Sequence, residues 1–243
     1  MTAMRLLLGS GGFRGEERRD ALRQAMRNHF GDIRRLLFVP YAIADGDAYV
    51  EALNKAELNA GYELIGLHRE SDPVKAIQEA EGIYVGGGNT FRLIRRMQTE
   101  GLLEPIRSRV AAGMPYLGIS AGTNVACPTM QTTNDMPIVH PASFEALGLV
   151  PFQVNTHYYA GQIHVRLGER EYEEHFGETR DDRIREFHEE NEAPVLGLWE
   201  SGLLRRDGER LDLLRGAVRL FRKGELPVDL DEGADLSDLL GGS

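Results

Sequence analysis

The sequence has almost no cysteine and no long apolar run, which excludes disulfide-rich proteins and disfavours membrane-spanning ones. Cys127 is its only cysteine in 243 residues, so an intramolecular disulfide cannot form. No apolar run approaches the length that crosses a bilayer. The apolar run at the N-terminus, MRLLL, is also too short for the apolar region of a signal peptide. We therefore expect a cytoplasmic protein.

Basic residues are in the minority. There are 28 lysines and arginines against 38 aspartates and glutamates, which gives a formal net charge of −10 at pH 7. A protein that binds nucleic acid nonspecifically needs a basic surface to receive the phosphates. We therefore predict neither nucleic acid nor membrane as a partner. An acidic protein can still bind an acidic substrate through one local cation.

The remaining composition suits a folded α/β protein. Hydrophobic residues make up 42% of the chain and charged residues 27%, so a sizeable core can be buried. No segment has the composition of a linker, and we predict one hydrolytic domain over residues 1–223. The segment 224–243 carries six acidic residues and no basic one, and we expect it to be a loosely held tail.

Short apolar runs alternate with longer amphipathic ones in the first half of the chain, which is typical of a parallel α/β sheet. The apolar runs are nearly continuous, as expected for strands covered by helices on both faces. The predicted strands are residues 4–8, 36–40, 62–67, 82–85 and 116–119. The predicted helices are residues 16–30, 46–60, 73–80 and 89–101. We therefore predict an α/β fold with a mostly parallel sheet flanked by helices.

The pattern changes after Ala121. Residues 129–141 are rich in Thr, Asn and Pro and indicate an ordered loop, and residues 179–190 indicate a charged helix. Four short apolar runs suggest antiparallel strands near the C-terminus, at residues 195–199, 203–204, 211–214 and 218–221.

One short motif indicates a nucleophile. Residues 118–122 read G-I-S-A-G, a G-x-S-x-G sequence, between a predicted strand and a segment that can form a helix. In such a turn the serine hydroxyl is lifted clear of the sheet, and the N–H of the next residue is free to meet a developing oxyanion. Ser120 is therefore the candidate nucleophile, and Ala121 is a candidate oxyanion donor.

A serine nucleophile needs a base and an acid that orients the base. His157 follows the apolar run 147–154, at the carboxyl end of a predicted strand, where open α/β sheets place their sites. Asp135, in a loop with few other charges, is the predicted acid, although the same residue could serve only to form a turn. All three lie within residues 120–157. This compact spacing differs from that of an α/β-hydrolase and favours another fold carrying the same chemistry.

Three consecutive glycines, residues 86–88, follow a predicted strand and precede a predicted helix. Such a loop lets backbone N–H groups converge, either as an oxyanion hole or as a phosphate cradle. The segment lacks the Gly-Lys-Ser/Thr ending of a P-loop and the G-x-G-x-x-G spacing of a dinucleotide site. Since the nucleophile turn follows the next strand, the oxyanion role is favoured, with Gly88 as the donor.

Several segments together resemble the peptidase E family of aspartyl dipeptidases. They are GGGNTF at residues 86–91, GISAGTN at 118–124, CPT at 127–129, TTNDMPIV at 132–139 and GETR at 177–180. The resemblance extends over residues 4–221. It implies a flavodoxin-like fold of the class I glutamine amidotransferase type, with serine in place of cysteine at the turn. It also implies hydrolysis of dipeptides with an N-terminal aspartate, without a metal or other cofactor.

The resemblance also implies roles for single residues. Ser120 would be the nucleophile, His157 the base and Asp135 the orienting acid, with Gly88 and Ala121 as oxyanion donors. Substrate binding would fall to two residues, Asn89 and Arg180. Arg180 would hold the β-carboxylate of the substrate, because a guanidinium forms two parallel hydrogen bonds with a carboxylate.

The sequence departs from the family in its acidic C-terminal tail and at two places closer to the predicted site. Tyr158 follows His157 where the resemblance leads us to expect phenylalanine, and the stretch 158–176 is longer than expected. Neither place includes a residue of the predicted triad.

Other functions stay open at this point. A cyanophycinase-like exopeptidase acting on β-linked Asp-Arg would share the fold and the serine turn. A noncatalytic binder of small ligands would use the glycine loop for phosphate. A metal-dependent hydrolase is disfavoured, because His157, His164 and His175 lack an H-E-x-x-H pattern or i, i+4 spacing. The predicted partner is a small acidic dipeptide, and a homodimer is left open.

Overall fold

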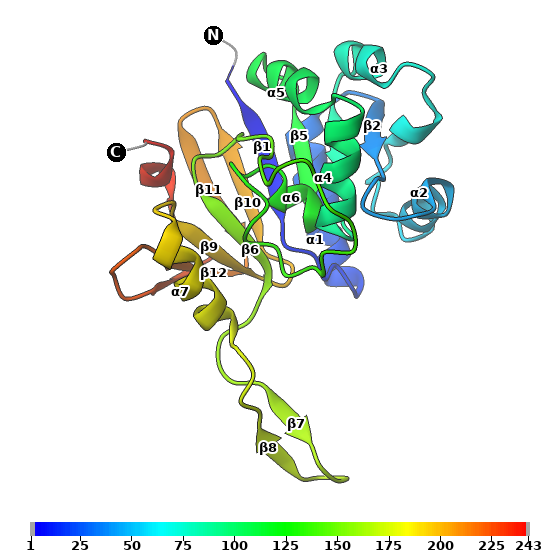
Figure 1. Ribbon diagram of the computed structural model, residues 1–243. Coiled ribbons are helices and arrows are strands. Elements are labelled where there is room, and N and C mark those ends of the chain that lie inside the picture. The colour runs from blue at the N-terminus through cyan, green and yellow to red at the C-terminus, as the bar shows by residue number, and fades with distance from the viewer. Residues whose placement is uncertain (1–2, 242–243) are drawn as a thin grey trace.

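A seven-stranded sheet lies at the centre of the protein in this computed structural model, which describes residues 3–241 (Figure 1). The strand order is β11-β10-β1-β5-β4-β2-β3, and the five strands from β1 to β3 run parallel. Their bounds are β1 (Arg5–Gly9), β2 (Arg35–Val39), β3 (Glu63–Gly66), β4 (Ile83–Val85), β5 (Tyr116–Ile119), β10 (Leu203–Asp207) and β11 (Arg210–Arg215). The predicted α/β fold with a mostly parallel sheet is confirmed.

Helices cover both faces of this sheet. Residues of β1 alternate between the faces: Leu7 packs with one buried cluster, whereas Leu6 and Leu8 pack with the other. The first cluster includes side chains of α1 (Glu16–Phe30) and α2 (Gly46–Lys55). The second includes side chains of α3 (Pro73–Glu79), α4 (Thr90–Thr99), α5 (Leu103–Ala111) and α6 (Ala121–Asn124). A 3-10 turn, η1 (Leu67–Arg69), precedes α3.

Two helical segments differ from the sequence-based expectation. α5 was not predicted, although Ile106 and Val110 in it are buried. α2 ends at Lys55 and not at residue 60, because the backbone at Glu57 and Ala60 adopts positive φ values of 55° and 53°. A helix cannot continue through residues in this left-handed region.

A second sheet of four strands lies beside the first, in the order β13-β12-β9-β6. Its strands are β6 (Gln153–Tyr158), β9 (Val195–Trp199), β12 (Ala217–Phe221) and β13 (Val228–Asp231). β6 and β9 run parallel, whereas β12 is antiparallel to both β9 and β13. α7 (Arg180–Glu190) packs on this sheet through Ile184. The carboxyl ends of β6 and β9 therefore lie at the same edge.

The acidic segment after Gly224, which we expected to be loosely held, is part of the folded structure. β13 extends the second sheet beyond residue 223, and the 3-10 turn η2 (Ser237–Leu240) follows it. Leu236 and Leu239 are buried in the main core. The apolar side chains spaced among the acidic residues explain this difference, because they bury while the carboxylates stay at the surface.

A two-stranded hairpin, β7 (His164–Arg166) and β8 (Tyr172–Glu174), projects away from the rest of the protein (Figure 1). It lies within the stretch that is longer than the family resemblance suggests. Large apolar side chains are exposed along it and at its base, at Tyr159, Leu167, Tyr172 and Phe176. Among residues 3–241, no helix combines the length and the apolar character that crossing a membrane requires.

Candidate active site

Ser120 occupies the turn between β5 and α6 in a strained backbone conformation. Its φ and ψ are 54° and −110°, a region that side-chain-bearing residues seldom adopt. The turn is held at both ends: the N–H of Ser120 donates to Gly9 O at 2.9 Å, and the N–H of Thr123 donates to Ser120 O at 2.8 Å. The nucleophile turn therefore has the geometry that the G-x-S-x-G motif predicts.

The two glycines of the motif allow close approach of backbone segments. A Cβ atom on Gly118 would lie 2.5 Å from Gly122 O, and one on Gly122 would lie 2.1 Å from Val85 O. Both distances are well below a normal contact with backbone. The motif is thus required for packing α6 against β5 and β4, which keeps Ser120 at the sheet edge.

His157 lies within hydrogen-bonding distance of this serine. Its Nε2 atom is 2.8 Å from Ser120 Oγ. The register of β6 with β9 shifts between Asn155 and Tyr158, and the φ of His157 is 53°. Such a bulge re-aims a side chain that would otherwise follow the strand. The N–H of His157 donates to Ser10 Oγ at 2.8 Å, which braces the bulge against the loop after β1.

Glu200 completes this chain of hydrogen bonds. Its Oε1 atom lies 2.8 Å from His157 Nδ1. Glu200 directly follows β9, and His157 lies near the end of the neighbouring parallel strand β6. The parallel pairing therefore brings the acid and the imidazole together. The side chains of His157 and Glu200 are 40% and 47% exposed, so substrate and water can reach the site.

The backbone N–H groups near Ser120 are suited to an oxyanion. Ala121 is the first residue of α6, so its N–H has no acceptor within the helix. The glycine loop lies directly beside the serine, since a Cβ atom on Gly87 would be 3.1 Å from Ser120 Cβ. Gly88 follows with a φ of 130°, which turns the loop toward α4. The segments that bear the two predicted donors therefore follow adjacent strands: Gly88 lies in the loop after β4, and Ala121 directly follows Ser120 after β5.

Arg180 provides a cation near this edge. It is the first residue of α7, whose capping box joins Thr179 and Asp182. Its Nη1 atom donates to Asn134 Oδ1, and Asn134 in turn donates to Thr156 O at 2.7 Å, next to His157. Burial lowers the pKa of Arg180, although an arginine stays charged at neutral pH.

No carboxylate pairs with this guanidinium among residues 3–241. Its Nε atom is buried without a hydrogen-bond partner, and the ring of Tyr159 lies 5.2 Å from its Cζ atom. A partly buried cation that lacks an acidic partner is an unfavourable arrangement unless an anion binds there. Arg180 therefore has the properties of a site for an anionic ligand group.

Comparison with known proteins identifies the family of the chain. The family model for peptidase family S51 matches residues 5–214. The chain belongs to peptidase family S51. Peptidase E from Streptomyces coelicolor is 50% identical over 208 residues, which cover 85% of this chain and 82% of that protein. A protein named probable alpha-aspartyl dipeptidase from Drosophila melanogaster is 43% identical over 239 residues, covering 97% and 96%.

Solved structures agree at the level of the fold. A peptidase from an acI-B1 actinobacterium has a TM-score of 0.63, with 17% identity and 96% of each chain covered. Membership in family S51 confirms the resemblance inferred from the motifs, and the chain is a peptidase.

In this S51 peptidase, Asp135 does not have the place that the sequence predicted. Its carboxylate accepts hydrogen bonds from the N–H of Thr90 at 2.7 Å and from two hydroxyls, Thr90 Oγ1 at 2.6 Å and Thr133 Oγ1 at 3.1 Å. It thereby joins the loop 129–141 to the start of α4. Glu200, and not Asp135, lies beside His157 Nδ1. Asp135 is committed to the helix N-terminus, where a carboxylate is favoured.

A signal for Glu200 exists in the sequence, although our reasoning missed it. The residue directly follows the apolar run 195–199, as His157 follows the run 147–154. The prediction favoured Asp135, between Ser120 and His157, over the acids near residues 169–174, and it made the strands of the last third antiparallel. An acid at the carboxyl end of a strand becomes a candidate only when that strand is parallel to the one that bears the histidine.

Asn89 also has a different use from the predicted one. Its Oδ1 atom accepts the N–H of Arg92 at 3.0 Å, which caps α4, and its Nδ2 atom donates to Met136 O at 2.9 Å. Both ends of the amide are therefore engaged within the chain. Cys127 is buried in the core, and burial raises the pKa of its thiol to about 12, which leaves it unreactive at neutral pH.

Proposed function

We propose that this peptidase is a serine dipeptidase that hydrolyses dipeptides with an N-terminal aspartate. The observation that carries the proposal is the continuous chain from Ser120 Oγ to His157 Nε2 and from His157 Nδ1 to Glu200 Oε1, with 2.8 Å at each step. It lies at the carboxyl ends of the strands, where α/β folds bind their ligands. The names of the relatives support the same activity.

The carboxylate of Glu200 accepts a hydrogen bond from the protonated Nδ1 of His157. Nε2 is then unprotonated and free to take the proton of Ser120. As this proton leaves, Oγ bonds to the carbonyl carbon of the dipeptide, and negative charge develops on the carbonyl oxygen. The N–H groups of Gly88 and Ala121 receive that charge. Nε2 then returns the proton to the leaving nitrogen as the C–N bond breaks. A water molecule, deprotonated by Nε2 of His157, then bonds to the acyl carbon, and Nε2 returns the proton to Ser120 Oγ as the bond between Oγ and this carbon breaks.

The preference for aspartate follows from Arg180. A free β-carboxylate would pair with a guanidinium that no acidic side chain neutralises in the described chain. Two parallel hydrogen bonds from the planar guanidinium would orient the substrate as well as bind it. Arg180 is linked through Asn134 to Thr156, one residue before His157. The substrate's acidic end and its scissile bond can thus be held by one connected group of residues.

The experiment is a hydrolysis panel of Asp-Leu, Asn-Leu, Glu-Leu and Ala-Leu, with β-linked Asp-Leu as a fifth substrate. We expect Asp-Leu to be preferred, and Ser120→Ala to lower its hydrolysis by on the order of 10⁴ or more. Arg180→Ala should lower kcat/KM for Asp-Leu by about 10²-fold, as for a lost charged pair. Equal losses on all substrates would assign Arg180 a structural role. Preference for the β-linked dipeptide would favour a cyanophycinase-like activity.

The setting of the enzyme is part of the same proposal. A single buried cysteine suits the reducing cytoplasm, and the net charge of −10 disfavours nucleic acid as a partner. A homodimer stays a prediction, and light scattering coupled to size-exclusion chromatography measures it directly.

A further inference from the structure

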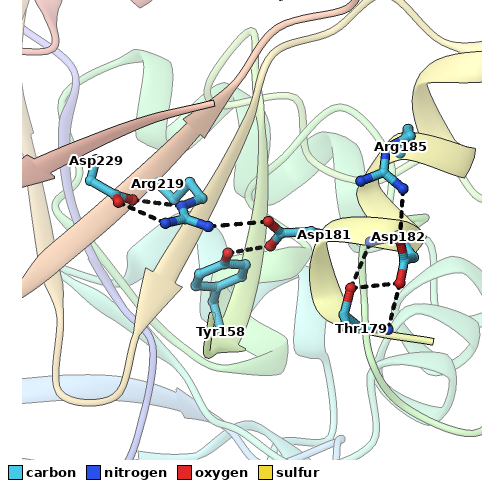
Figure 2. Close-up of polar contacts among 7 residues, drawn as sticks. All are labelled: Tyr158, Thr179, Asp181, Asp182, Arg185, Arg219 and Asp229. Carbon is cyan, nitrogen blue, oxygen red and sulfur yellow. Dashed lines mark hydrogen bonds and ion pairs between the residues drawn. The ribbon is translucent and has the colours of Figure 1, made fainter. Parts of the chain in front are cut away.

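A group of polar side chains that the proposed mechanism does not use lies at the start of α7 (Figure 2). The hydroxyl of Tyr158 donates to one carboxylate oxygen of Asp181. The other oxygen of Asp181 accepts Nη1 of Arg219 at 3.1 Å. Arg219 also donates Nε and Nη2 to the two oxygens of Asp229, at 2.6 and 2.7 Å. Residues of β6, α7, β12 and β13 are thereby joined.

The ring of Tyr158 is held in place by aromatic neighbours. The residue is only 1% exposed, and its ring packs edge-on against Trp199 and Phe221, with centroid distances of 4.5 and 5.9 Å. Burial and the neighbouring Asp181 raise the pKa of Tyr158, so the hydroxyl remains a donor. A buried donor without an acceptor would be destabilising. The position of Asp181 is therefore coupled to the position of a rigid ring in β6.

This contact joins the two functional segments at neighbouring residues. Tyr158 directly follows His157, and Asp181 directly follows Arg180. The chain between them cannot set their distance, because most of it forms the hairpin that projects away from the protein (Figure 1). The hydrogen bond between Tyr158 and Asp181 therefore connects the neighbours of His157 and Arg180 directly, whereas the connection along the chain runs through the whole hairpin.

Successive side chains at the start of α7 point in different directions, as expected for a step of about 100° per residue. Arg180 contacts Asn134, and Asp181 contacts Tyr158 and Arg219. Asp182 contacts Thr179 and Arg185 (Figure 2). The contacts of Asp182 lie within the helix and its cap. Those of Arg180 and Asp181 reach other elements in two different directions, and they hold the first turn of the helix in place. The guanidinium of Arg180 is consequently kept at one place relative to His157.

We propose that Tyr158, Asp181 and Arg219 are positioning residues that set the affinity for the substrate's β-carboxylate by holding Arg180 in register with His157. This inference rests on the proposed role of Arg180 as the receptor for that carboxylate. None of the three has to touch the substrate. Their effect is on binding through Arg180, and proton transfer among Ser120, His157 and Glu200 does not depend on them.

The test is Tyr158→Phe, which removes one hydroxyl and keeps the ring that packs against Trp199. We expect KM for Asp-Leu to rise about tenfold, which corresponds to the loss of one hydrogen bond to a charged group, here that of Tyr158 to Asp181. The kcat should stay within about twofold of that of the parent. Tyr172→Phe is the matched control, because Tyr172 is 61% exposed on β8, and we expect unchanged kinetics. Asp181→Asn, which weakens the pair with Arg219, should raise KM in the same direction and serves if Tyr158→Phe does not fold.

A double substitution separates positioning from a general structural effect. In an Arg180→Ala background, Tyr158→Phe should have no further effect on kcat/KM for Asp-Leu, because the residue that it positions is gone. A further tenfold loss in that background, a fall in kcat with unchanged KM, or no change in either constant in the single variant would overturn the inference. If Arg180→Ala itself leaves KM unchanged, the proposed function fails first, and the inference fails with it.

Discussion

The assignment of the orienting acid leads to a sharp comparison between two carboxylates. Glu200 lies 2.8 Å from His157 Nδ1, whereas Asp135 accepts hydrogen bonds from Thr90 and Thr133. Each can be replaced by its amide, which preserves size and shape. Glu200→Gln removes the charge that holds the imidazole and stabilises its protonated form. Asp135→Asn removes a charge at the start of α4.

The two substitutions should affect kcat and stability differently, because Glu200 contacts His157 whereas Asp135 contacts the start of α4. In a buried triad, replacing the acid by its amide lowers kcat about 10⁴-fold. Here the side chains of His157 and Glu200 are 40% and 47% exposed, so water can replace part of the lost interaction. We therefore expect Glu200→Gln to lower kcat by about 10²- to 10³-fold. Asp135→Asn should lower the free energy of unfolding by about 1–3 kcal/mol and change kcat by less than about fivefold.

The assay is hydrolysis of Asp-Leu at saturating and subsaturating concentrations, together with urea denaturation of each variant. Ser120→Ala defines the background rate. If Asp135→Asn lost as much kcat as Ser120→Ala while Glu200→Gln stayed within about threefold of the parent, Asp135 would be the catalytic acid in solution, and the reasoning from the contact between His157 and Glu200 would be refuted.

Two further predictions concern packing and pH. Gly11→Ala should lower kcat by about tenfold or more, since the added Cβ atom would lie 2.5 Å from His157 Cε1 at a residue with φ of 138°; a kcat equal to that of the parent would contradict this placement of the imidazole. Burial lowers the pKa of His29 from 6.5 to about 3. As the pH falls, the unfolded chain therefore binds a proton at this residue before the folded chain does. The free energy of unfolding then falls below about pH 6.5, by at most about 1.4 kcal/mol per pH unit. Urea denaturation at pH 7 and pH 5 measures this loss, which should be smaller in His29→Gln; the same pH dependence in both proteins would exclude His29 as its cause.

Local patterns in the sequence were sufficient for the parallel sheet. Each of the five predicted N-terminal strands lies within one residue of its observed ends. These strands are short apolar runs bounded by polar or glycine residues, so the information that defines them is contained in a few consecutive positions. The nucleophile turn is similar, because the two glycines that its packing requires are themselves part of the motif.

The tail and the second sheet were less predictable. Residues 224–241 are acidic, and composition alone suggested loose attachment, yet Leu236 and Leu239 are buried. The direction of β9 was also not evident, because an apolar run of five residues is the same in a parallel and in an antiparallel pair. The direction of β9 is defined only by its pairing in the sheet, where it runs parallel to β6 and antiparallel to β12.

The sequence by itself determined the fold class and indicated Ser120 and His157 as the proposed nucleophile and base, because each depends on a local pattern of strand and turn. The identity of the third residue was decided by tertiary structure. Glu200 lies 43 residues after His157 and reaches it only because two strands far apart in the chain pair in parallel and end at one edge. The place of Arg180 depends in the same way on contacts of α7 with β6 and β12. Contacts between such distant residues come from the assembly of the sheets, which no short segment encodes.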